Sequence, residues 1–145
     1  MTHDKRDNVR KWVEALCVLN SFSEDQMPAL LASYFDDPVW RDMPFKEMRG
    51  VRDGLLHARL ANWDESLGGW VIDAAVRKIV EEYLKLSQPE KWRALHHAAY
   101  CLFDGWQRQY PSERDRWHAQ ADYHCACLTD ACYDRPDCPD GKTES

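Results

Sequence analysis

Four cysteines near the end of the chain carry the clearest chemistry in the sequence. They are Cys125, Cys127, Cys132 and Cys138. Structural zinc sites use four nitrogen or sulfur ligands arranged as a tetrahedron, and thiolate sulfur is a common ligand. The four cysteines therefore predict a zinc-binding site, in which Cys138 is supplied by the tail of the chain.

The same spacing allows other states of these thiols. On a continuous helix, Cys125 and Cys132 share a face, whereas Cys127 points about 160° away. A four-cysteine site therefore requires the helix to end near Leu128. Without a metal, we expect Cys125 and Cys132 to be small buried side chains. Disulfides are the remaining alternative, and Cys127 with Cys138 is the most flexible pair. The C-x-C-x4-C spacing is similar to the zinc-binding tail that follows SET methyltransferase domains.

Two histidines form further candidate ligand pairs. His97 with Cys101, and His118 with Asp122, are each four residues apart. Each pair therefore shares one helix face and offers two ligands. His97 could also act as a base and Cys101 as a nucleophile. The sequence indicates no third group that would orient them.

The other candidate histidines, His96 and His124, fall on predicted inner helix faces. We expect them to be hydrogen-bonded core side chains, with His124 as a second candidate base for Cys101. The sequence contains no dinucleotide-binding glycine motif, no P-loop and no nucleophile elbow. The common nucleotide-binding and hydrolase signatures are therefore excluded.

Almost throughout the chain, apolar residues recur at the spacing of a helix, so helices must position these side chains. Asp36-Asp37-Pro38 ends one helix, a loop-rich segment covers residues 36–50 with one short strand at Val39-Trp40, and Gly68-Gly69 marks the clearest break. The sequence predicts an all-α fold, a single compact bundle of about six helices. We expect one helical domain over residues 1–133 and a flexible acidic tail over residues 134–145. The predicted helices cover residues 4–20, 23–35, 50–65, 70–86 and 113–133, with one more that restarts at residues 87–90 and has an inner face as far as Trp106.

Two of these helices have well-defined apolar faces. In the helix of residues 70–86, the apolar side chains recur at helical spacing, and a stripe of that width is typical of a core-facing helix. We therefore expect four of them to be buried together. They are Ile72, Val76, Ile79 and Tyr83. The next helix has a predicted inner face of Trp92, Leu95, His96, Ala99, Leu102, Phe103 and Trp106.

Length and composition limit the classes of protein. The chain has 145 residues, 44% of them hydrophobic, seven tryptophans and a net charge of −6. This size suits one domain with a core. The sequence has no basic stripe of the kind that binds nucleic acid directly. It also has no apolar run long enough to cross a membrane. The charged first residues do not resemble a secretory signal, so we expect a cytoplasmic protein with reduced thiols.

Residues 9–56 carry one family resemblance. They contain the segment Leu31–Trp40, the Met43-Pro44 loop, and an Arg49-Gly50-Val51-Arg52-Asp53 step into a third helix. In this order the features resemble the opening of a SnoaL-like protein, the cone-shaped fold that includes limonene-epoxide hydrolase. The resemblance implies an enzyme with four long alternating strands. Residues 70–133 have helical period where those strands and their catalytic carboxylates would lie, so no catalytic residue is carried over.

The main functional interpretation is a protein that acts by binding another protein. An acidic surface and many tryptophans are typical of interaction surfaces. We expect an adaptor, a regulator or an inhibitor, for example an inhibitor of a nucleic-acid-handling complex. A SnoaL-like enzyme and a zinc-stabilised helical domain are the alternatives.

Overall fold

The computed structural model describes residues 13–19, 21–22, 45–67 and 69–138. The helix predicted over residues 23–35 and the strand predicted at Val39-Trp40 lie outside these residues, as do most of the helix over 4–20 and most of the loop-rich segment. The chain divides after Trp92 into two units. The predicted helical character is confirmed for the described residues, which are mostly helical. The predicted single bundle is not confirmed.

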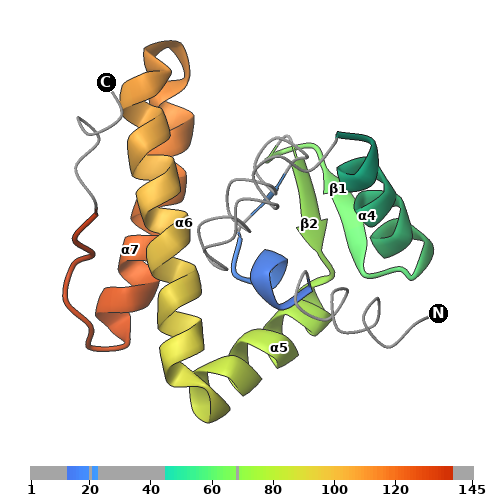
Figure 1. Ribbon diagram of the computed structural model, residues 1–145, viewed down its shortest axis with the longest axis horizontal. Coiled ribbons are helices and arrows are strands. Elements are labelled where there is room, and N and C mark those ends of the chain that lie inside the picture. The colour runs from blue at the N-terminus through green and yellow to red at the C-terminus, as the bar shows by residue number, and fades with distance from the viewer. Residues whose placement is uncertain (1–12, 20, 23–44, 68, 139–145) are drawn as a thin grey trace. The chain divides into compact units, whose positions relative to one another are not determined.

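The described elements follow one another along the chain as Figure 1 shows. Residues 13–17 are helical. They are followed by α4 (Phe45–His57), β1 (Ala61–Asp64), β2 (Gly69–Ile72), α5 (Ala74–Ser87), α6 (Pro89–Gln109), the 3-10 turn η1 (Pro111–Glu113) and α7 (Arg114–Asp130).

A β-hairpin occupies the region where the sequence analysis predicted helix. The helix predicted over residues 50–65 ends at His57, and β1 pairs with β2 in antiparallel register. Trp63 lies opposite Trp70, and their ring centroids are 5.1 Å apart in an edge-to-face arrangement. Aromatic cross-strand pairs stabilise antiparallel strands. In the turn, the Asp64 carboxylate accepts hydrogen bonds from the Ser66 hydroxyl at 2.6 Å and the Leu67 amide at 3.0 Å.

A buried segment of the first unit extends this hairpin. Phe22 and Trp70 exchange backbone hydrogen bonds of 2.8 and 2.9 Å. Gly69 makes the close approach feasible, because a Cβ atom there would lie 3.2 Å from the Phe22 carbonyl oxygen. The residues before Phe22 contribute a run of buried apolar side chains. They are Ala15, Leu16, Cys17, Val18 and Leu19.

Helix α5 begins later than predicted and turns a different face to the core. It starts at Ala74 because the Asp73 carboxylate accepts hydrogen bonds from the Ala75 and Val76 amides, as an N-cap does. Leu84 is fully buried, whereas Ile79 is 70% exposed and Tyr83 is 45% exposed. The predicted burial of Ile79 and Tyr83 is therefore wrong. Helical period identifies an apolar face, but it does not show what covers that face.

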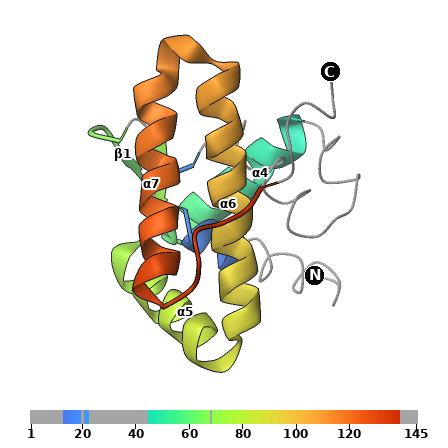
Figure 2. The same ribbon diagram turned by 90° about the vertical axis from the view of Figure 1, so that its left-hand side faces the viewer.

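In the second unit, α6 and α7 lie side by side and run in opposite directions (Figure 2). The predicted inner face of α6 is confirmed at Trp92, Leu95, His96, Ala99 and Phe103, all of which are buried. Phe103 stacks on Trp117 of α7 with nearly parallel rings, 5.8 Å between centroids. The remaining buried apolar side chains of α7 are Ala121 and Leu128.

Helix α7 ends three residues before the predicted boundary at residue 133. The Tyr133 amide donates to the Leu128 carbonyl and the Cys132 amide to the Thr129 carbonyl, each at 3.0 Å. This is the hydrogen-bond pattern of a Schellman motif. Cys132 has a φ of 67°, the left-handed conformation that this motif requires.

The chain then returns along α6. The Arg93 guanidinium lies 4.9 Å from the centre of the Tyr133 ring. The Arg135 guanidinium donates to the Tyr100 hydroxyl at 3.5 Å, and Cys138 is bonded to Cys101. Residues 134–138, predicted as the start of a flexible tail, are thus attached to the face of α6 that holds Arg93, Tyr100 and Cys101.

Candidate functional site

The four predicted zinc ligands occupy different environments. Cys125 and Cys127 are half-buried on α7, Cys132 is exposed just beyond its end, and Cys138 forms a disulfide with Cys101. In the described part of the chain, where Cys101 and Cys138 are joined by a disulfide, no group of three His, Cys, Asp or Glu side chains could hold a metal ion. The Cys138 sulfur cannot join a disulfide and a zinc site together, so the four-cysteine site remains a prediction for the reduced protein.

The disulfide joins helix α6 to the returning chain. Cys101 and Cys138 are 37 residues apart in sequence and 5.5 Å apart between Cα atoms. Both cysteines are half-buried. If disulfides form, the sequence favours pairing of Cys138 with Cys127, which is nearer to it in sequence than Cys101. The return of the chain along α6 brings Cys101 to it instead.

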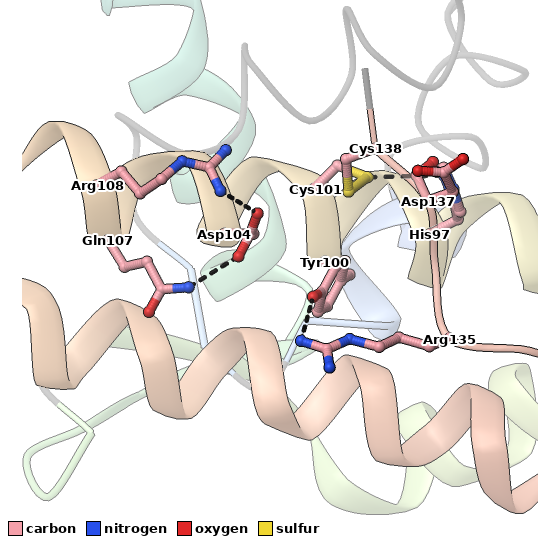
Figure 3. The surroundings of a disulfide bond; sticks show 9 residues. All are labelled: His97, Tyr100, Cys101, Asp104, Gln107, Arg108, Arg135, Asp137 and Cys138. Atoms are coloured by element: carbon pink, nitrogen blue, oxygen red, sulfur yellow. Dashed lines mark hydrogen bonds and ion pairs between the residues drawn. A yellow bond between two sulfur atoms is a disulfide. The ribbon is translucent and has the colours of Figure 1, made fainter. Parts of the chain in front are cut away.

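His97 lies one helical turn before Cys101 and contacts the disulfide (Figure 3). Its Nδ1 atom is 3.9 Å from the Cys101 sulfur, and its Nε2 atom is 3.1 Å from the Asp137 carbonyl oxygen. A carbonyl oxygen only accepts, so Nε2 carries the hydrogen. In the neutral imidazole, Nδ1 is then the lone-pair nitrogen beside the sulfur. The third group that the sequence did not indicate is thus a backbone carbonyl, which no side-chain pattern reveals.

Polar side chains on either side of the disulfide are already paired. The Asp104 carboxylate accepts from Arg108 at 2.7 Å and from Gln107 at 2.8 Å. The hydrogen bond from Arg135 to Tyr100 raises the pKa of the Arg135 guanidinium. These contacts direct Asp104 toward two side chains of its own helix and hold the returning chain against α6.

The other candidate histidines pair with side chains of their own unit. His96 and His124 are fully buried, and their Nδ1 atoms are 2.9 Å apart. One ring must donate and the other must accept, as expected for hydrogen-bonded core histidines. His118 is exposed and contacts Asp122 at 3.1 Å through Nε2 and Gln107 at 3.0 Å through Nδ1.

The first unit carries a different kind of surface. The exposed apolar side chains of α5 recur at positions 79, 83 and 86, so they form one stripe along the helix, hereafter the α5 stripe. Its end residue Leu86 is 79% exposed. Beside α5 and the hairpin lies an open depression whose lining has more acidic than basic side chains. The acidic ones are Asp64, Asp73, Glu81 and Glu82, and the basic ones are Arg77 and Lys78. Its best-defined ion pair joins Arg77 to Glu81 at 3.5 Å.

Comparison with known proteins found no match among family models, curated proteins or solved structures. In the described part of the chain, each helix is too short or too polar to cross a membrane. The functional argument therefore depends on the contacts and exposure described above.

Proposed function

We propose that this protein acts by binding another protein through the α5 stripe, defined by Ile79, Tyr83 and Leu86. The observation that supports the proposal is the exposure of these three large apolar side chains on successive turns of one helix. Single exposed apolar residues are common on protein surfaces, but an aligned row is typical of a binding surface.

The chemistry of the stripe indicates the kind of partner. An apolar face with anchors at this spacing fits a hydrophobic groove of another protein. Burying an exposed Ile or Leu side chain contributes about 1.5–3 kcal/mol. Lys78 and Glu82 are exposed on the same helix, so the rim of the contact carries both signs of charge.

The proposed class is an adaptor, a regulator or an inhibitor. The net charge of −6 favours a partner with a basic surface, which includes proteins of nucleic-acid-handling complexes. We place the protein in the cytoplasm. Because the prevailing reductants there keep thiols reduced, the Cys101–Cys138 disulfide would be open in that compartment. The SnoaL-like alternative receives no support: the strands of the described part of the chain are four residues each, whereas the cone requires long ones.

Site-specific crosslinking tests this proposal. A photoreactive residue would replace Ile79 or Leu86 in separate full-length proteins, and Lys78 in a control that is exposed about 100° away around the helix. We expect positions 79 and 86 to label the same protein in cells, and position 78 to label it weakly. In a binding assay between the two purified proteins, we expect the Ile79→Glu variant to lose binding to that partner and the Lys78→Glu variant to retain it. Equal binding by the two Glu variants would refute the role of the stripe.

A further inference from the structure

We propose that the reduced protein binds a zinc ion through Cys101, Cys138 and His97, a set different from the four cysteines clustered in the sequence. Cys101 and His97 lie on one face of α6, one turn apart, and the returning chain places Cys138 against Cys101. The Cys101 sulfur is thus next to both the His97 ring nitrogen and the Cys138 sulfur in the oxidised structure (Figure 3).

The separation of Cys101 from His97 is close to that of two ligands in a zinc site. With Zn–S bonds of about 2.3 Å and a Zn–N bond of about 2.0–2.1 Å, neighbouring ligand atoms in a tetrahedron lie about 3.6–3.8 Å apart. The His97 Nδ1 atom is 3.9 Å from the Cys101 sulfur. The two sulfur atoms are bonded in the oxidised structure, so they must separate when the disulfide is reduced and the site forms.

His97 has the orientation of a metal ligand. Metal-binding histidines commonly donate their second ring N–H to a carboxylate or a backbone carbonyl, which fixes the ring and the tautomer. His97 makes this contact through Nε2 with the Asp137 carbonyl, at 3.1 Å. Because Asp137 precedes Cys138, the segment that presents one ligand also orients another.

Reduction generates the site with balanced chemistry. A cellular dithiol donates two electrons and two protons to the Cys101–Cys138 disulfide and becomes a cyclic disulfide itself. The zinc ion then displaces both thiol protons and binds two thiolates and the neutral imidazole of His97. The two thiolate charges neutralise the ion, and the fourth position is open to water.

Cobalt titration of the full-length protein tests the proposal, because Co²⁺ bound to thiolates absorbs in the near ultraviolet. With a phosphine reductant, we expect one cobalt equivalent to bind and one zinc equivalent to displace it. The oxidised protein should bind none. Cys101→Ser, Cys138→Ser and His97→Gln should each lose the band, with helical circular dichroism as the check on folding.

Cysteines on and beyond α7 supply the matched controls. Cys125→Ser, Cys127→Ser and Cys132→Ser should retain the cobalt band, whereas a site built from the four clustered cysteines would lose it. That alternative site would also tolerate Cys101→Ser and His97→Gln. The proposal is overturned if those two variants keep full cobalt binding, if the reduced protein binds none, or if the oxidised protein binds it equally well.

Discussion

At the scale of single residues, Cys17 is a thiol that ionises with difficulty. Cys17 is fully buried, and burial, with a smaller effect of the Glu81 charge, raises its pKa to about 12. Alkylating reagents react with thiolate. At about pH 8.5, the usual pKa of cysteine, we expect iodoacetamide to modify the exposed Cys132 and to leave Cys17 unmodified. Mass spectrometry of the native protein measures both.

The raised pKa of Cys17 also has a consequence for stability. The folded state keeps this thiol protonated, whereas the unfolded chain loses the proton near pH 9. The contribution to stability is therefore complete below about pH 9 and decreases as the pH rises toward 12. Cys17→Ala should reduce this alkaline loss in urea unfolding, and an unchanged pH dependence would contradict the burial of the thiol.

Cys132 holds a backbone conformation that suits another residue better. Its φ of 67° is left-handed, a region that glycine enters without a steric cost. Cys132→Gly should stabilise the protein by about 1 kcal/mol, whereas Cys132→Ala should change little. Chemical unfolding of the two variants checks this. Destabilisation by glycine would show that the side chain contributes more than the backbone.

How far the site could be predicted depended on the kind of interaction. The pairing of His97 with Cys101 follows from helical spacing, and so does the core location of His96. The partner of Cys101 did not follow, because Cys138 is brought to it by a change of chain direction after α7. Local spacing favours neighbours such as Cys127, while the fold decides which thiols meet.

At the scale of elements, α5 shows the limit of periodicity. The helical period of the sequence predicts a core position for Ile79, where truncation to Ala costs about 2–5 kcal/mol. Because Ile79 is 70% exposed, we expect Ile79→Ala to cost less than about 0.5 kcal/mol. Leu84→Ala, on the buried face of the same helix, should cost about 2–5 kcal/mol. Urea unfolding of the two variants measures both losses. A larger loss of stability for Ile79→Ala than for Leu84→Ala would contradict this assignment of the exposed and buried faces.

The helices were predicted better than the strands for a physical reason. Helix α6 combines a proline start with one continuous apolar face, so local signals agree with packing. The hairpin has strands of four residues, too short for alternation to stand out against helical period. Its pairing depends on Trp63 meeting Trp70 and on contact with Phe22, which are tertiary interactions.

At the scale of the whole molecule, the division into two units predicts a local effect of the disulfide. A cross-link over 37 residues stabilises by about 2–4 kcal/mol, mainly by limiting the unfolded chain. Both cysteines belong to the second unit. Cys138→Ser should therefore lower amide-exchange protection in α7 by that amount and leave the β-hairpin unchanged. Equal loss of protection in both would show that the units unfold together.

The disulfide also alters what a single cut in the backbone can do. The turn η1 and the exposed Arg114 lie between Cys101 and Cys138 in sequence, so this stretch is a covalent ring. A protease that cleaves once after Arg114 opens the ring without dividing the molecule. The product should migrate as one species on a gel without reductant and as two fragments with it. For this half of the protein, survival of proteolysis is then governed by the redox state of its surroundings.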